Sequence, residues 1–195
     1  MITSKLISNA LFSDKSLKSA NELKTYAGIK NLATMEQTHS DVVLRAKEPK
    51  KYLSDGIITE NPNLGLLVQT ADCLPILLKD NKTIGAVHSG WRGLKNNIIR
   101  KVIKNFDISK LAISVGPHAQ SCCYEVKEDV SKYFMNDIDF RNKKLYLNMS
   151  KILKDLSKDI GFQIEISSIC TICDSSYNSY RENRTLKRQY GIIWL

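Results

Sequence analysis

Histidine is rare in this chain of 195 residues, which contains only His39, His88 and His118. A blue-copper centre alone uses two histidines and one cysteine. One histidine would then remain for all the other copper ions of a four-copper oxidase. The sequence therefore excludes four-copper oxidase chemistry.

Cysteine is too sparse and too irregular for a disulfide framework. The five cysteines are an odd number and two of them, Cys122 and Cys123, are adjacent, which suits a reduced compartment. Cys170 and Cys173 have the spacing of a zinc knuckle or a redox pair, but a second pair of that spacing is missing. Spacing alone therefore assigns no metal or redox role to these four thiols.

Long apolar runs are absent as well. Within the first twenty residues Ser, Asp and Lys interrupt the apolar positions, so the sequence shows neither a signal peptide nor a membrane span. We therefore expect a cytoplasmic protein without membrane contact. No internal repeat or low-complexity linker divides residues 1–195, which we interpret as a single domain.

The formal net charge is +9, yet no basic cluster accompanies it. Lysines outnumber arginines 22 to 7 and are spread along the chain in short pairs such as Lys50-Lys51, with no aromatic-basic RNA motif. This pattern favours a solvated lysine-rich surface over a nucleic-acid interface, although a basic field could attract anionic substrates. We expect a monomer.

Short apolar segments and amphipathic helices alternate along the chain. Periodicity predicts helices over 16–26, from Trp91 onward, over 127–134 and over 149–160, the last stopped by Gly161. The predicted strands are 42–45, 56–59, 64–70, 75–78, 83–88, 111–115, 163–168 and 191–195. This mixture predicts the α+β class, a mixed-sheet sandwich with outer helices.

Two histidines and one cysteine are placed where sites are usually built. Cys73 lies between two apolar runs, His88 ends a third, and His39 precedes a further strand-like segment. Two imidazoles and one thiolate are an adequate ligand set for zinc and leave a fourth position open. Packed, structural His and Cys residues are the alternative.

The motifs around these residues closely resemble those of the YfiH-like family, whose members carry laccase-domain, polyphenol oxidase or zinc-dependent purine nucleoside phosphorylase descriptions. The resemblance runs in order from about residue 37 to residue 195. It rests on Gln37-Thr-His39, Asp55-Gly-Ile-Ile-Thr59, Thr70-Ala-Asp-Cys-Leu-Pro75, Val87-His-Ser-Gly-Trp-Arg-Gly93, Gly116-Pro117, Tyr124-Glu-Val126 and Tyr180-Arg181.

The resemblance implies a zinc ion bound by His39, Cys73 and His88, with a single copper ion as a substitute that the same donors accept. Zinc in such a site lowers the pKa of a coordinated water to about 7. The implied activities are phosphorolysis of adenosine, inosine or methylthioadenosine and hydrolytic deamination of adenosine, with a nucleoside and phosphate as partners. The comparison with the family's motifs also leads us to expect a shortened N-terminal region, residues 1–36.

Two residues beside the metal-ligand motifs are candidates for catalysis. Asp72 could orient a ligand or transfer a proton, or could simply hydrogen-bond the turn. Arg92 could bind phosphate or a carboxylate through its planar fork, or could form a salt bridge with a neighbouring acid.

Further candidates for substrate binding lie toward the C-terminus. Arg181 and Arg188 resemble two family arginines, although the usual Thr-Gly-Arg is Thr185-Leu-Lys-Arg188 here. Tyr180, and also Tyr177, could stack on a base or pack in the core. His118 could contact substrate, or hydrogen-bond the backbone of its own loop.

Three other functions remain open on the sequence. Without metal, Cys73 and His88 would form a thiol-hydrolase dyad, which would survive a chelator. Some relatives in the family are linked to peptidoglycan-precursor editing, which would imply an amide hydrolase. The non-enzymatic alternative is a zinc-stabilised binding module, for which the net charge suggests RNA as a partner, but no fourth protein ligand that would close the site is apparent.

Overall fold

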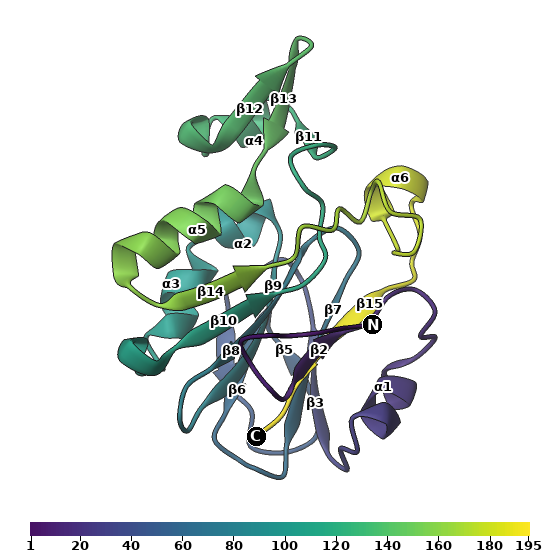
Figure 1. Cartoon of the computed structure of the whole chain (residues 1–195), viewed down its shortest axis with the longest axis vertical. Helices are drawn as coiled ribbons and strands as arrows, with labels where there is room; N and C mark the ends of the chain where they lie inside the picture. Colours follow the sequence, from purple (N-terminus) through teal and green to yellow (C-terminus); the bar gives the residue numbers. More distant parts are fainter.

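Two six-stranded sheets face each other in the computed structural model, which describes residues 1–195 (Figure 1). The first sheet has the order β1 (Ile2–Thr3), β2 (Ala10–Phe12), β15 (Gln189–Ile193), β7 (Gly65–Thr70), β3 (Leu32–Glu36) and β5 (Lys51–Leu53). The second has the order β14 (Gln163–Ile166), β10 (Ala112–Val115), β8 (Leu74–Lys79), β9 (Ile84–Ser89), β6 (Gly56–Thr59) and β4 (Val43–Arg45). The predicted α+β sandwich is confirmed.

The central strands are buried on both faces, which explains their continuous apolar runs. In β7, Leu66 belongs to the cluster between the sheets, whereas Leu67 belongs to the cluster beneath helix α1 (Ala20–Tyr26). In β8, Leu77 joins the cluster between the sheets, and Ile76 and Leu78 join the cluster beneath the other helices. Successive side chains of a strand point to opposite faces, so each strand contributes to two cores.

Helices α3 (Ile98–Ile103) and α5 (Met149–Ile160) cover the outer face of the second sheet. Val102 of α3 and Leu153 of α5 lie in the same buried cluster as Ile76. The bounds of α5 match the prediction, because Asn148 caps its start and Gly161 ends it in the left-handed conformation at φ 95°.

The prediction of one continuous helix from Trp91 is wrong. The segment forms α2 (Trp91–Lys95) and α3, separated at Asn97, whose φ of 61° is left-handed. Leu94 and Ile98 are nevertheless both buried in one cluster. The apolar periodicity therefore identified the buried face correctly, but it did not show that the helix is interrupted.

The other differences concern short elements. Residues 1–36 contribute β1, β2 and β3, which no alternating pattern predicted, along with the predicted helix α1, capped by Ser19. The predicted helix 127–134 shortens to α4 (Glu128–Ser131). It lies beside a third sheet of β11 (Glu125–Val126), β13 (Lys144–Leu147) and β12 (Ile138–Arg141), which projects from the two larger sheets in Figure 1.

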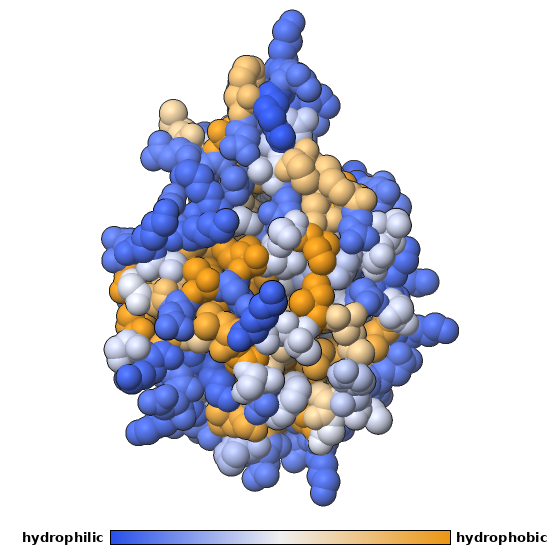
Figure 2. Space-filling view, in the orientation of Figure 1, coloured by the Kyte–Doolittle hydropathy of each residue, from blue (hydrophilic) through white to orange (hydrophobic).

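The surface agrees with a dispersed charge. Figure 2 shows hydrophilic residues around most of the rim of one face, with hydrophobic side chains visible across its middle. No helix combines the length and the apolar character needed to cross a membrane.

Candidate metal centre and pocket

The candidate site lies where strands of both sheets end at one edge. The first residue of β8, Leu74, pairs with the last residue of β9, Ser89, because these strands are antiparallel. This pairing brings Cys73 beside His88. In the first sheet β3 and β7 are parallel and end together, and the side chain of Gln37 exchanges two hydrogen bonds with the backbone of Gln69. The loop that follows β3 therefore carries His39 to the same edge.

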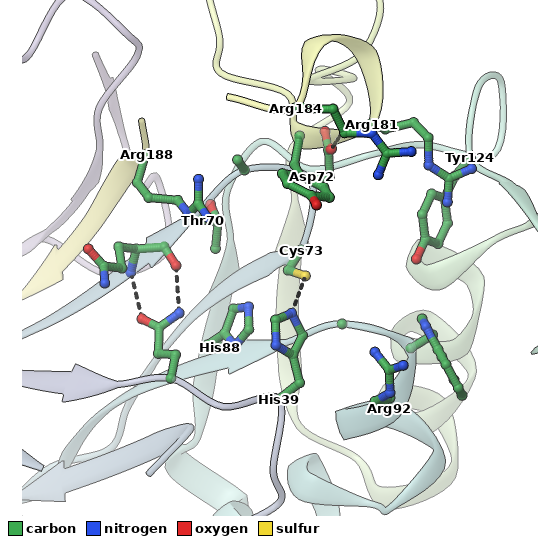
Figure 3. A pocket seen from close by; sticks show the side chains of 16 residues that line it. His39, Thr70, Asp72, Cys73, His88, Arg92, Tyr124, Arg181, Arg184 and Arg188 are labelled. Atoms are coloured by element: carbon green, nitrogen blue, oxygen red, sulfur yellow. Dashed lines mark hydrogen bonds between the residues drawn. The ribbon is translucent and has the colours of Figure 1, made fainter. Parts of the chain in front are cut away.

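The structure brings His39, Cys73 and His88 together (Figure 3). Their ligand atoms all lie within 4.8 Å of one another, and His39 Nε2 lies 3.8 Å from Cys73 Sγ. The two imidazole rings meet edge to face, with centroids 4.8 Å apart. His88 is buried and His39 is exposed, so the group has a protected side and an open side.

Asp55 orients the histidines, although it was not among the site residues predicted from the sequence. Its buried carboxylate accepts a hydrogen bond from His88 Nδ1 at 2.7 Å, which leaves Nε2 of that ring for a ligand. It also accepts from the backbone N–H groups of Thr38, His39 and Ser40. A carboxylate behind a metal-binding histidine fixes its tautomer and orientation. The signal available in the sequence was Asp55 within a family motif.

The backbone at Gly90 leaves room for the thiol. A Cβ at this position would lie 2.9 Å from Cys73 Sγ and 3.5 Å from His39 Cδ2. Only glycine therefore leaves the sulfur undisturbed at this corner. Together with the donor types and the Asp55 contact, this space fits a metal ion bound by the three side chains.

The ionisation of Cys73 also suits a cation, which would displace the proton of His88 on binding. Burial opposes ionisation of Cys73, but the attraction of His88 and the hydrogen bond with His39 outweigh it and lower the pKa of the thiol to about 6. Burial likewise opposes a charged His88, whereas Cys73 and Asp55 raise its pKa to about 9. Thiolate is the form of cysteine that binds metals.

A pocket of about 510 Å³ opens above the three side chains. Four arginines line it, and Figure 3 shows them surrounding Cys73: Arg92, Arg181, Arg184 and Arg188. None of them forms an ion pair with a carboxylate, in contrast to Arg45 and Arg100 on the surface. The salt-bridge alternative for Arg92 is therefore wrong; its guanidinium lies over the ring of Trp91 at 4.6 Å.

Asp72 is at the pocket, but both of its carboxylate oxygens are engaged. Oδ1 accepts from the hydroxyl of Thr171 at 2.8 Å, and Oδ2 accepts from the backbone N–H of Arg181 at 2.7 Å. Its backbone is left-handed, with φ 86°. These contacts make Asp72 a positioning residue that holds helix α6 (Tyr180–Asn183) against the pocket.

Two pocket residues were missed as site candidates. Tyr124 was quoted only as part of a motif, and Arg184 was not considered; both line the pocket, and neither has a spacing that distinguishes it from surface residues. The predicted Tyr180, Arg181 and Arg188 also line it. Burial, followed by the charge of Cys73, raises the pKa of the Tyr124 hydroxyl above its usual value.

His118 and Tyr177 are not part of this pocket. His118 is fully buried, and its Nδ1 donates to the carbonyl oxygen of Gly116 while its Nε2 contacts the Ser150 hydroxyl and the Gln120 amide. Burial lowers the pKa of His118 to about 4. The prediction of a substrate contact is wrong for His118, because both ring nitrogens are used inside the fold. Tyr177 is buried outside the pocket lining.

The fold and the site together define an α+β two-sheet protein with a His–Cys–His group in an arginine-lined pocket. The model of the family described as multi-copper polyphenol oxidoreductase laccase matches residues 14–195. The chain belongs to this family.

Named relatives cover most of the chain. A purine nucleoside phosphorylase of Aquifex aeolicus is 34% identical over 174 residues, which are 85% of this chain and 83% of the relative. A purine nucleoside phosphorylase of Clostridium acetobutylicum is 31% identical over 188 residues, 88% of this chain and 80% of the relative.

Solved structures share the fold. YlmD from Geobacillus stearothermophilus superposes with a TM-score of 0.87 at 17% identity, covering 98% of this chain and 93% of that one. The Bacillus licheniformis hypothetical protein YfiH gives 0.81 at 23% identity, covering 89% and 78%. The resemblance to the YfiH-like family is thus confirmed.

Proposed function

We propose that this protein is a zinc-dependent purine nucleoside phosphorylase. The observation that carries the proposal is the position of His39, Cys73 and His88 in a pocket lined by four arginines that lack carboxylate partners. Soft metal ligands and unpaired guanidinium groups in one pocket suit a metal-dependent reaction in which an anion takes part. The names of the two relatives described above agree with phosphate as that anion.

The metal would be held by Nε2 of His88, an imidazole nitrogen of His39 and the thiolate of Cys73. Zinc bound by these three donors would supply a Lewis acid and would lower the pKa of a coordinated water. The same donors accept a single copper ion, but a multi-copper centre lacks ligands. Of the three histidines, only two reach the site, and the third is buried with both ring nitrogens engaged.

Phosphate would bind to the arginines. The guanidinium of Arg181 is fixed because it donates to the carbonyl oxygen of Glu125 at 2.6 Å and lies over the Tyr124 ring at 5.0 Å. Arg92 is supported in the same way by Trp91. Planar guanidinium groups held by aromatic rings bind phosphate oxygens in a bidentate manner without first giving up an ion pair. They would present phosphate to C1′ of the ribose.

The nucleoside would occupy the remaining space between the aromatic residues. Tyr180 lines the pocket with 44% of its surface exposed and offers a ring face for the purine. The Tyr124 hydroxyl is protonated at neutral pH, as any tyrosine is, and burial raises its pKa further above the ordinary value. As the C1′–N9 bond breaks, this hydroxyl would donate a hydrogen bond to a ring nitrogen of the departing base.

The proposal also includes two more specific activities, the deamination of adenosine and the phosphorolysis of methylthioadenosine. Deamination needs water at the purine carbon that bears the amino group, and the open side of the site, next to exposed His39, admits water. Methylthioadenosine differs from adenosine only at the 5′ position. The pocket volume of about 510 Å³ lies within the roughly 300–1,000 Å³ typical of small-molecule sites and accommodates either nucleoside.

A metal-free thiol hydrolase is the second candidate function. The 3.8 Å contact between Cys73 Sγ and His39 Nε2, with a thiol pKa of about 6, favours it because an ionised cysteine beside a base is a nucleophile. A chelator separates the two candidates. Chelation abolishes a metal-dependent reaction and leaves a thiol-dependent reaction intact.

The deciding experiment follows adenosine and inosine with and without phosphate, product by product, on wild-type protein of measured zinc content. We expect adenine or hypoxanthine with ribose 1-phosphate only when phosphate is present, and inosine with ammonia from adenosine when it is absent. His88→Ala should abolish all products. Arg100→Ala is the matched control, because Arg100 pairs with Asp159 outside the pocket lining. No turnover by a fully zinc-loaded wild type would refute the proposal.

A further inference from the structure

Four of the five cysteines converge in a second cluster outside the candidate metal centre. The sulfur atoms of Cys122, Cys123, Cys170 and Cys173 all lie within 4.8 Å of one another. Cys173 Sγ lies 2.8 Å from Cys123 Sγ and 3.5 Å from Cys122 Sγ. Spacing alone assigned these thiols no role, because a second pair with the spacing of Cys170 and Cys173 is missing from the sequence. Their partners are instead an adjacent pair about fifty residues away.

Parallel strands bring the two pairs together. β10 and β14 are parallel neighbours, with Val115 opposite Ile166, so both chains leave the second sheet at the same edge. Beyond the strands the two loops stay in contact through a bridge between His118 and Cys170. The backbone N–H of Thr171 donates to the carbonyl oxygen of His118 at 3.1 Å. The pairing of β10 with β14 and the hydrogen bonds between the two loops therefore hold the two cysteine pairs close together.

The donor set suits one tetrahedral ion. Zinc lies about 2.3 Å from each thiolate in structural sites, and a tetrahedron of that size separates its sulfur atoms by about 3.8 Å. Cys170 is buried at 7% exposure and its Sγ also accepts the backbone N–H of Gln120 at 3.4 Å. A single disulfide among the four would leave two further thiols side by side without a function. Four sulfur atoms that all lie within 4.8 Å of one another can share a single ion once the 2.8 Å pair, Cys123 and Cys173, moves apart to the tetrahedral separation.

We propose that Cys122, Cys123, Cys170 and Cys173 bind a structural zinc ion. The four protein ligands fill its coordination positions, so this site has no place for a substrate, in contrast to the three-ligand group at the pocket. The proposal does not depend on the proposed function, because its ligands are separate from that group.

A zinc ion bound by the four cysteines would hold in place the two loops that carry Tyr124 and Thr171 next to the pocket. Tyr124 directly follows Cys123, and Thr171 directly follows Cys170 and donates its hydroxyl to Asp72 at 2.8 Å. Asp72 in turn holds the backbone N–H of Arg181. Cross-linking the two loops would therefore fix the positions of the tyrosine hydroxyl and of helix α6.

Zinc stoichiometry tests the proposal. We expect two zinc ions per wild-type chain, one in Cys173→Ser, one in His88→Ala and none in the double variant. Ser121→Ala, in the same turn as Cys122, is the matched control and should keep both ions. One zinc ion in the wild type, with no loss in Cys173→Ser, would overturn the proposal.

If Cys173→Ser does not fold, X-ray absorption spectroscopy at the zinc edge can instead be measured on the His88→Ala variant, in which all four clustered cysteines are intact. We expect four sulfur neighbours at about 2.3 Å and no nitrogen neighbours, because only the cysteine site remains. A mixed nitrogen and sulfur shell would refute the site. Loss of two hydrogens in the mass of the wild-type protein, measured without reductant, would instead show a disulfide and also overturn the proposal.

Discussion

Asp55→Asn tests whether the buried carboxylate sets up the candidate metal centre. Oδ1 of Asp55 accepts from His88 Nδ1 and from the backbone N–H of His39, at 2.7 and 3.1 Å. Oδ2 accepts from Ser40 N and Oγ, both at 2.7 Å, and from Thr38 N at 3.1 Å. An asparagine has one acceptor oxygen, and this oxygen should take the place of Oδ2, where four donors converge once the Thr38 hydroxyl at 3.5 Å is included. The NH2 group then faces His88.

The expected magnitude follows from the tautomer of His88. An NH2 group donates, so His88 Nδ1 must become the acceptor and its proton must move to Nε2, the nitrogen left for the metal. Loss of such an outer partner typically weakens metal binding by about 10- to 100-fold, or about 1.4–2.7 kcal/mol. The His39 N–H also loses its acceptor, which should lower the free energy of unfolding by about 1–3 kcal/mol.

Zinc competition titrations against a chromophoric chelator measure the first effect, and thermal unfolding of metal-free protein measures the second. Asp80→Asn is the control, because buried Asp80 accepts the backbone N–H groups of Lys82, Thr83 and Asp107 outside the pocket lining. It should lower stability without changing zinc affinity. A zinc dissociation constant for Asp55→Asn within twofold of the wild-type value would refute the role of Asp55.

Three further predictions concern the pocket. Arg92→Ala should raise the KM for phosphate about 10- to 100-fold in steady-state assays, with little change in the KM for nucleoside. The control variant Arg100→Ala should change neither KM. Equal effects of Arg92→Ala on both KM values would contradict phosphate binding by Arg92. Tyr124→Phe should lower kcat by about 10²-fold or more while phosphate binding is retained, because the departing base loses its donor; an unchanged kcat would remove Tyr124 from the mechanism. Metal binding requires the thiolate of Cys73, whose pKa is about 6, and a neutral His88, whose pKa is about 9. Zinc affinity should therefore rise about tenfold per pH unit between pH 6 and pH 9, because one proton is displaced from His88, and more steeply below pH 6. A pH-independent dissociation constant for zinc would contradict this.

The family description points to copper oxidation and the names of the relatives point to phosphorolysis, and the side chains of the pocket distinguish between these two kinds of chemistry. A copper oxidase needs several histidines in one place, and His118 cannot serve because its ring is buried between Gly116 and Ser150. A phosphorylase needs positive groups without partners, and the pocket supplies four. The composition of the site therefore favours the relatives' names over the family description.

The sequence by itself determined the elements that have strong periodicity. Strands such as β6 and helix α5 have the predicted bounds, because continuous apolar runs and helical spacing reflect burial that each segment needs for itself. The motifs also determined the family and the candidate ligands His39, Cys73 and His88. These residues stand beside strand ends, where local pattern and family motif coincide.

Only the tertiary structure decided which distant residues meet. Asp55 reaches His88 because β6 and β9 are antiparallel neighbours. The family motif that contains Asp55 does not by itself distinguish this role from that of a turn residue. The four clustered cysteines meet because β10 and β14 run parallel, although Cys122 and Cys173 are 51 residues apart. The sequence determines the chemistry of each side chain. Strand pairing determines the distances between the histidine, cysteine and carboxylate groups, and those distances decide which ions or substrates they can bind.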